Sequence, residues 1–154
     1  MPDQNIDRET YFTLFNEIGI ISQLSRAMFE RRLPEGYLLP HFSVLNHLIR
    51  VRDGQTPLAL ARAFQVPKTT MTHMLGILER GTLIALKPNP EDGRSKCVWI
   101  TDDGRRFRDN AIASLDPDFV ALASSISLKD ASSLLPGLQA LRKYLDQARD
   151  PKDD

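Results

Sequence analysis

The chain has 154 residues, a formal net charge of zero and a single cysteine, Cys97. Its length allows one domain with a core, or a small module with an oligomerisation arm. One cysteine excludes an intramolecular disulfide and a cysteine-cluster metal site. No run of about 18 apolar residues and no basic-then-apolar leader is present, so the sequence predicts a cytoplasmic protein with no membrane partner, no metal and no cofactor.

Charge is distributed unevenly along the chain. Residues 50–108 carry 11 Lys and Arg against 6 Asp and Glu, a local charge of +5. Residues 1–49 carry 4 against 6, and residues 109–154 carry 5 against 8, so both ends are acidic. Zero net charge argues weakly against a nucleic-acid partner, but the basic middle segment is typical of a region that meets a polyanion.

The first third of the chain predicts two helices. Residues 1–8 are polar and expected to be flexible, and residues 9–32 show helical periodicity with two adjacent, largely apolar stripes. Such a helix usually touches its own domain and a partner, and burial in a single core is the alternative. After a break at 33–36, Pro40 opens a second helix that runs to about Val51. Its inward residues are Phe42, Leu45, Leu48 and Ile49.

The next segment has the pattern of a helix-turn-helix. Thr56 is a strong N-cap residue, and Pro57 suits the first position of a short helix that ends near Phe64. Residues 65–67 form a turn, and residues 68–80 form a second helix. Its inward face carries Met71, Met74, Leu75 and Leu78, and its other faces carry Lys68, Thr69, Thr70, Thr72 and His73.

That outward face is short hydrogen-bonding side chains, a lysine and a histidine, with no carboxylate before Glu79. It suits a helix that contacts base edges in the major groove of DNA. An ordinary amphipathic surface helix is the alternative reading of this segment alone.

A β-hairpin with a basic tip is predicted directly after this helix. Gly81 ends the helix, residues 83–86 read as one strand and residues 97–100 as the next. Alternation predicts that Val98 and Ile100 lie on one side of the second strand, and Cys97 and Trp99 on the other. Turn formers fill 87–93, and Arg94, Ser95 and Lys96 follow them. Helix-turn-helix plus hairpin is the winged form of the motif.

The last third of the chain predicts further helices. Thr101 caps one that runs to about Leu115, and Asp116-Pro117 interrupts or restarts it. Ser127 begins a last helix with a leucine stripe, and Pro136-Gly137 is expected to kink or split it. Residues 150–154 are expected to be flexible.

The chain at this point resembles the MarR (multiple-antibiotic-resistance regulator) family of winged-helix regulators. The resemblance is carried by T-P-L-A-L-A-R-A-F-Q-V-P-K-T-T-M-T-H-M-L-G-I-L-E-R-G-T-L-I and by P-E-D-G-R-S-K-C-V-W-I-T-D-D-G within 56–104, and the layout fits over about 9–149. It implies a mainly α fold with a small hairpin wing, in which 9–33 and 102–149 form a dimerisation body. Residues 38–101 would form the DNA-binding lobe, and 1–8 and 150–154 the flexible ends.

The resemblance also implies a function and its residues. The expected protein is a homodimeric regulator, a repressor, that binds a pseudo-palindromic operator in double-stranded DNA. The helix 68–80 would enter the major groove, Arg94 would reach the minor groove, Asp92 would shape the wing tip, and Thr56 would cap a helix near a phosphate. DNA contacts are expected from Lys68, Thr69, Thr70, Thr72, His73, Arg94, Ser95 and Lys96. A small lipophilic or aromatic effector would bind a cleft near Phe15, Phe29, His41 and Phe42, for which plain core packing is the alternative.

Two positions depart from the family pattern. Pro67 stands where a capping Ser or Asp is common, and His73 where Arg is common, so the operator sequence is harder to infer. Among rivals, an enzyme is disfavoured because His41 and His47 lie six residues apart, and no nucleophile or phosphate-loop motif is present. A winged module that binds protein instead of DNA is the other rival. Cys97 reads as a small hydrophobic residue or as a redox sensor.

Overall fold

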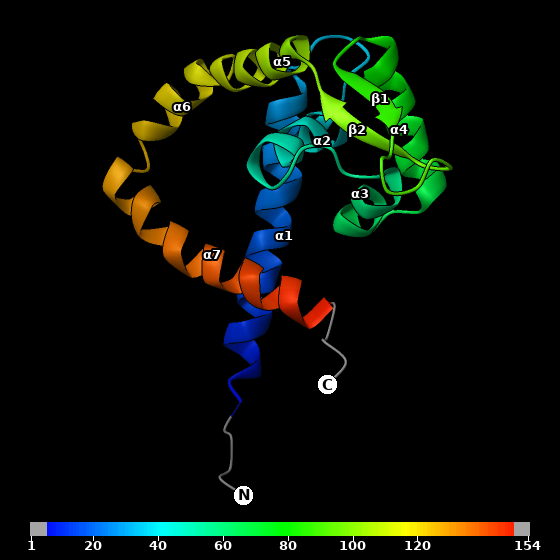
Figure 1. The fold of residues 1–154 in the computed structure, drawn as a ribbon. Helices are drawn as coiled ribbons and strands as arrows, with labels where there is room; N and C mark the ends of the chain where they lie inside the picture. Colours follow the sequence, from blue (N-terminus) through cyan, green and yellow to red (C-terminus); the bar gives the residue numbers. More distant parts are fainter. Residues whose placement is uncertain (1–5, 150–154) are drawn as a thin grey trace, which may run out of the picture. The chain divides into compact units, whose positions relative to one another are not determined.

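The computed structural model describes residues 6–149. Within this range the chain forms helices and one antiparallel hairpin (Figure 1). In chain order the elements are α1 (Arg8–Glu30), α2 (Leu39–Arg50), α3 (Pro57–Phe64), α4 (Lys68–Arg80), β1 (Ile84–Pro88), β2 (Lys96–Ile100), α5 (Asp102–Ala113), α6 (Asp116–Ala123) and α7 (Leu128–Arg149). The described chain divides into two compact units, one ending at Ser114 and one beginning at Leu115.

The N-terminal helix begins earlier than the sequence predicts. The Asp7 carboxylate accepts hydrogen bonds from the Thr10 backbone N–H at 3.0 Å and from its hydroxyl at 2.7 Å, so α1 begins at Arg8. Residues 7 and 8, expected in the flexible end 1–8, thus cap and begin this helix. The predictions for 1–5 and 150–154 lie outside the described residues. No residue of α1 is buried.

Helix α2 supplies the centre of the first unit. Phe42, Leu45 and Leu48 are buried as predicted, and Val44 and His41 are buried as well. The Nδ1 atom of His41 accepts the Leu38 backbone N–H at 2.8 Å, which satisfies a donor at the start of the helix. His41, the third residue of the helix, thus accepts the N–H of the N-cap residue, as Glu or Gln does in a capping box.

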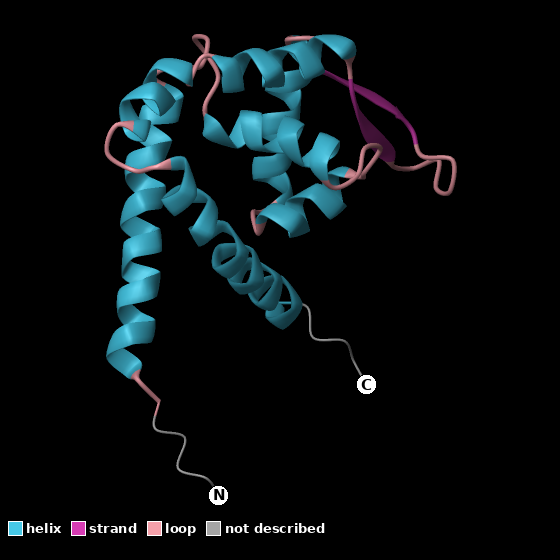
Figure 2. Cartoon of the chain, turned by 90° about the vertical axis from the view of Figure 1, so that its left-hand side faces the viewer, coloured by secondary structure: helices cyan, strands magenta, loops and turns pink. Residues whose placement is uncertain are grey.

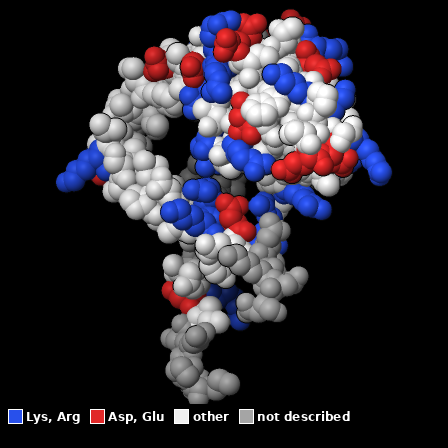
Figure 3. Space-filling model, in the orientation of Figure 1, with Lys and Arg blue, Asp and Glu red and all other residues white. Residues whose placement is uncertain are grey.

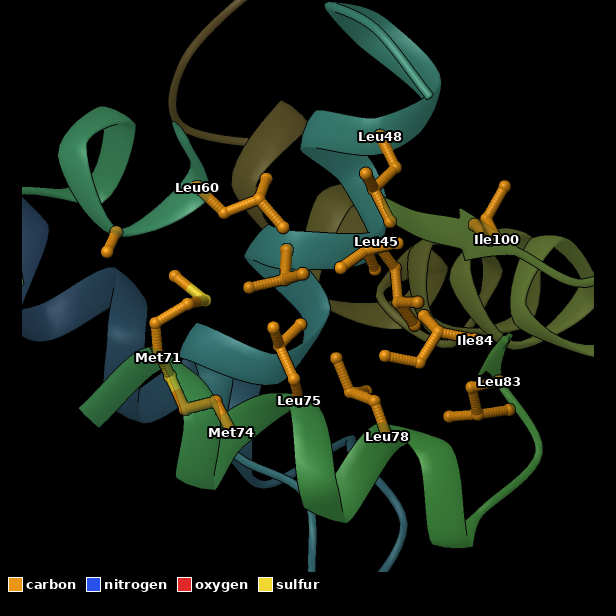
Figure 4. Packing of buried hydrophobic residues seen from close by; sticks show 13 residues of the cluster. Leu45, Leu48, Leu60, Met71, Met74, Leu75, Leu78, Leu83, Ile84 and Ile100 are labelled. Atoms are coloured by element: carbon orange, nitrogen blue, oxygen red, sulfur yellow. The ribbon is translucent and has the colours of Figure 1, made fainter. Parts of the chain in front are cut away.

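A single hydrophobic core joins α2, α3, α4 and the hairpin (Figure 4). Leu45, Leu48, Leu60, Met71 and Leu78 are each less than 2% exposed. The inward face of α4 is the predicted one, since all four of its apolar residues are buried. Helix α4 is thereby held by its apolar side, and its opposite side faces outward.

The hairpin pairs β1 with β2 antiparallel, with Ile84 opposite Ile100 and Leu86 opposite Val98 (Figure 2). The chain before α3 adds a third segment, because the Val98 N–H donates to the Gln55 carbonyl at 2.7 Å and the Gly54 N–H donates to the Val98 carbonyl at 3.0 Å. Val98 and Ile100 are buried, and on the other side of the strand Cys97 is 7% exposed, whereas Trp99 is 40% exposed. Burial of Cys97 agrees with its reading as a small hydrophobic residue.

Helix α5 belongs to the first unit and packs against α2. The Thr101 hydroxyl accepts the Gly104 N–H at 3.0 Å and caps the helix as predicted. A Cβ at Gly104 would collide with the Leu83 carbonyl oxygen, so this glycine allows α5 to start close against the hairpin. Farther along, the Arg108 guanidinium donates twice to the Asn46 side-chain oxygen, at 3.1 Å each.

The second unit contains α6 and α7, and neither helix buries a residue. The Ser127 hydroxyl accepts the Asp130 N–H at 3.1 Å, which confirms the predicted start of α7. Helix α7 continues through Pro136 as one element, so the alternative of two separate helices is wrong. Within 6–149 no single helix is long and apolar enough to cross a membrane, and one sharply bent helix pair passes by length and composition only.

Candidate nucleic-acid interface

The outward side of α4 is exposed as the sequence predicts. Lys68, Thr69, Thr70, Thr72 and His73 are all exposed, while the buried side holds the helix against the core. The turn before it is tight, because Gln65 adopts a left-handed conformation with φ of 52°. Five short or cationic side chains are therefore presented together on one rigid helix.

The first turn of α4 has no side-chain cap. Pro67 occupies the N-cap position and offers no hydrogen-bonding side chain, so the first backbone N–H groups of the helix have no side-chain acceptor. Such groups, together with the helix dipole, favour an anion at this end of a helix. The preceding helix differs, since the Thr56 hydroxyl accepts the Ala59 N–H at 3.2 Å and caps α3.

The wing tip between β1 and β2 presents Arg94. The Asp92 carboxylate accepts the Arg94 backbone N–H at 3.0 Å, so Asp92 acts on the backbone conformation of the tip. The guanidinium-bearing side chain of Arg94 is exposed. Ser95 is half-buried, and its hydroxyl donates to the Asp92 carbonyl at 3.2 Å.

A hollow of about 580 Å³ separates the wing from the starts of α3 and α4. It brings together six of the predicted residues, namely Thr56, Lys68, Asp92, Arg94, Ser95 and Lys96, beside Pro57, Leu58, Leu86 and Asn89. Its lining therefore holds three cationic side chains against one carboxylate. Thr69, Thr72 and His73 are not part of this lining and lie on the exposed side of α4.

Basic charge is concentrated locally rather than spread over the lobe. On the face in Figure 3, Lys and Arg side chains alternate with acidic ones. The acidic residues nearest α5 are partly occupied in ion pairs, for example Asp53 with Arg105 at 3.6 Å. The hollow between the wing and α4 is where cations exceed carboxylates among its lining residues.

A second, mainly apolar hollow of about 290 Å³ lies on another side of α4. It is lined by Arg26, Leu39, Pro40, Ser43, Phe64, Val66, Thr70 and Met74. The predicted effector residues lie elsewhere: the rings of Phe29 and Phe42 are 4.6 Å apart, and Phe15 is 46% exposed on α1. His41, the fourth of them, is buried and caps α2.

Two histidines of α2 have lowered pKa values. Burial lowers the pKa of His41 from 6.5, and the nearby His73 lowers it further. Burial also lowers the pKa of His47. The His47 Nε2 lies 3.2 Å from the Gln55 Nε2, which also donates to the Arg52 carbonyl at 2.9 Å. The Gln55 amide is thus a donor, and His47 Nε2 is its acceptor.

Sequence reasoning missed Asn89 and Asp53. Asn89 lines the hollow and makes two side-chain hydrogen bonds within the wing tip. Asp53 accepts the N–H groups of Gly54 and Ile100, both at 3.0 Å, and joins the base of the wing to the turn before α3. A proline on each side of Asn89 was the available signal for the first. Asp53-Gly54 has the pattern of a turn, but nothing local indicates the bond of Asp53 to Ile100, 47 residues away.

The sequence of this region is similar to that of known transcriptional regulators. A profile of the MarR family matches residues 35–95. The transcriptional regulator HosA of Escherichia coli O111:H- is 27% identical over 113 residues, which is 71% of this chain and 82% of HosA.

Solved structures share the fold. The transcriptional regulator BldR of Sulfolobus solfataricus aligns with a TM-score of 0.75 at 23% identity, covering 90% of this chain and 99% of BldR. A mutant of Escherichia coli MarR, complexed with operator DNA, aligns at 0.68 with 20% identity, covering 89% and 99%. The expected fold class, mainly helical with a two-stranded wing, is thereby confirmed.

Proposed function

Because the chain belongs to the MarR family of winged helix-turn-helix, DNA-binding transcriptional regulators, we propose that it acts in the cytoplasm as a homodimeric repressor on a pseudo-palindromic operator. The observation that carries the proposal is the joint exposure of α4 and the cationic hollow between α4 and the wing. Regulators of this family are not enzymes. The Escherichia coli MarR structure with operator DNA supports the choice of partner.

Base recognition falls to α4 in this proposal. Thr69, Thr70, Thr72 and His73 are exposed on a helix that the core holds rigidly, and their hydroxyl and imidazole groups suit base edges in the major groove. Each good contact contributes about 1–3 kcal/mol of discrimination. The short threonines require the helix to approach the bases closely.

Phosphate and minor-groove contacts fall to the rim of the hollow. Lys68, Lys96 and the uncapped first turn of α4 neutralise phosphates and displace counterions, so affinity decreases steeply with salt. Arg94, exposed at the wing tip, enters the adjacent minor groove and responds to its width. Affinity thus comes from the hollow, and sequence discrimination from α4.

Dimerisation is supported by three helices without buried residues. Helices α1, α6 and α7 each carry large apolar side chains that are exposed, among them Phe12 at 69%, Val120 at 74% and Leu134 at 61%. A soluble chain seldom leaves such faces uncovered, and most soluble oligomers are symmetric assemblies of identical chains, so a second copy of this chain is the expected partner. Two-fold symmetry then requires two half-sites about one DNA turn apart.

The test is DNA binding by Arg94→Ala. A duplex selected from a random pool by the wild-type protein serves as the operator, and fluorescence anisotropy gives its affinity. We expect a loss of about tenfold or more, which corresponds to one good contact. Lys87→Ala is the matched control, because Lys87 lies on the same hairpin, outside the hollow, with its Nζ 5.9 Å from the Trp99 ring centre.

Unchanged affinity in Arg94→Ala would exclude the wing contact. Absence of any salt-dependent DNA binding by the wild-type protein would favour the rival, a winged module that binds protein. Stoichiometry at saturation tests the dimer, with two chains expected per selected duplex. A reporter promoter carrying that duplex separates repression from activation.

An effector is the finer part of the proposal. The apolar hollow beside Thr70 and Met74 is large enough for a small aromatic molecule. Arg26 lies in its lining, and although its Nε donates to Glu30 at 3.1 Å, its remaining N–H groups are suited to donate to a carboxylate. The paired rings of Phe29 and Phe42 are the second candidate. A ligand releases DNA only if it binds better to a conformation of α4 that fits the grooves poorly.

Benzoate, the simplest aromatic carboxylate, tests this part. We expect it to weaken DNA binding by the wild-type protein and to have less effect on Ser43→Phe, whose side chain would fill the apolar hollow. Loss of the effect in Phe29→Ala alone would move the site to the aromatic pair. If benzoate changes neither protein, an aromatic acid is not the effector, and the DNA-binding proposal stands unaffected.

A further inference from the structure

One asparagine connects both sides of the wing tip. The Asn89 side-chain oxygen accepts the Glu91 backbone N–H at 3.0 Å, and its side-chain nitrogen donates to the Ser95 hydroxyl at 3.0 Å. Asn89 follows β1 directly, and Ser95 directly precedes β2. A single side chain therefore fixes the first turn of the tip and closes it against its last residue.

The backbone of the tip forms a closed set of hydrogen bonds around this side chain. The Asn89 N–H donates to the Ser95 carbonyl at 3.1 Å, the Ser95 N–H to the Asp92 carbonyl at 3.0 Å, and the Asp92 N–H to the Asn89 carbonyl at 3.3 Å. The Asp92 carboxylate holds the Arg94 N–H. Arg94 thus lies in a tip that the Asn89 side chain ties together, through its hydrogen bonds to Glu91 and to Ser95.

We infer that Asn89 is a positioning residue for Arg94 and that Ser95 is its structural partner instead of a DNA contact. The inference rests on the proposed function and refines its list of DNA-binding residues. The role requires an acceptor and a donor at once, which the carboxamide of asparagine provides and which alanine and aspartate do not. Ser95 uses its hydroxyl twice inside the tip, accepting from Asn89 and donating to the Asp92 carbonyl.

Loss of the Asn89 links leaves the tip with several backbone conformations, of which only some present Arg94 to the DNA. Apparent affinity decreases by the fraction of time spent in the competent one. We expect a roughly threefold to tenfold loss for Asn89→Ala and a similar loss for Ser95→Ala. The lobe should stay folded, because the tip contributes no residue to the core.

A double-mutant cycle tests the inference on the full chain with the selected duplex. Affinities are measured for the wild type, Asn89→Ala, Arg94→Ala and the double variant. Because Asn89 acts through Arg94, its removal should cost nothing further once Arg94 is absent. The same cycle with Ser95→Ala should also show full coupling. Amide hydrogen exchange should be faster at Glu91 in Asn89→Ala, because its N–H loses its acceptor, and faster at Arg94, because its acceptor Asp92 lies in the loosened tip.

The results distinguish the positioning role of Asn89 from the DNA contact of Arg94. Additive losses in the cycle would overturn the inference and leave the proposed wing contact intact, since Asn89 or Ser95 would then touch DNA directly. No loss in Asn89→Ala would overturn it as well. No loss in Arg94→Ala would end the wing contact itself, and the positioning role with it.

Discussion

The two longest helices and the winged lobe use apolar residues in opposite ways. Helix α1 has 23 residues and α7 has 22, and neither buries one. Helix α4 has 13 residues and buries four. The lobe therefore contains a core of its own, whereas the long helices carry large apolar side chains that stay exposed in the described chain. Amphipathic periodicity alone indicates that a face will be covered but not which chain covers it.

The difference has a physical basis in what each face meets. In the lobe, three helices and a hairpin surround one cluster, so Leu45, Leu60 and Leu78 lose all contact with water. In α7, a long regular helix presents Leu134, Leu138 and Leu145 at 61%, 44% and 45% exposure. The first arrangement stabilises the lobe itself, and the second, in the proposed function, stabilises the dimer.

The largest expected effect follows from breaking the uncovered face. Leu138→Glu combined with Leu145→Glu places two charges on the exposed apolar stripe of α7, where a partner helix would have to desolvate them. We expect sedimentation to shift from a dimer to the monomer mass of 17.4 kDa. DNA affinity should decrease with it, because two half-sites are no longer joined.

The matched control adds the same charge elsewhere on the same helix. Gln139→Glu combined with Gln147→Glu changes two exposed polar positions of α7 and should leave the dimer intact. A stable dimer in the leucine variant would show that α7 is not the interface. Equal dissociation in both variants would attribute the effect to net charge.

A smaller effect is expected from the covered core. Leu45→Ala removes a side chain that is completely buried, and we expect the free energy of unfolding to decrease by about 2–5 kcal/mol. Trp99, the only tryptophan, lies on β2 and reports lobe unfolding through its fluorescence. Leu134→Ala in α7 should change the free energy of unfolding that this signal reports by about 0.5 kcal/mol or less. A comparable loss in both would mean that the lobe depends on the second unit for its stability.

Local signals explain how much of the lobe was predictable. Thr56, Pro57 and Gly81 mark helix ends through caps and missing donors, so the bounds 68–80 of the recognition helix are those observed. Turn formers marked the wing, and its strands differ from prediction by a residue or two. The exposed polar face of α4 also follows from periodicity, because its buried face is strongly apolar.

Long-range contacts explain what the sequence did not reveal. Residues 54 and 55 add a segment beside β2 by pairing with Val98, and nothing near Val98 in sequence indicates it. Of the two effects predicted for Pro136-Gly137, a kink or a split, the split did not occur, since α7 continues through the proline despite the missing N–H. Asn89 read as one turn former among several, and its link to Ser95 depends on the closed hairpin.

The smallest expected effect concerns pH and separates the two regions again. All three histidines of the chain lie in α2 and α4, and two of them have lowered pKa values. The unfolded chain has ordinary histidines with a pKa near 6.5, so below that pH it binds more protons than the folded lobe. Stability is therefore unaffected by these groups above about pH 6.5 and decreases as the pH falls toward the folded-state pKa.

Urea unfolding followed by Trp99 fluorescence between pH 7.5 and 5.5 measures this loss. His47→Gln should reduce it, because glutamine accepts the Gln55 amide without titrating. His73→Gln changes an exposed position and removes only the second cause of the lowered pKa of His41, after burial, so it should retain most of the slope. The Leu138→Glu and Leu145→Glu variant should show the same pH dependence as the wild type at Trp99, because α7 contains no histidine. A pH dependence that disappears with the dimer would assign the titrating groups to the assembly and contradict the burial argument for α2.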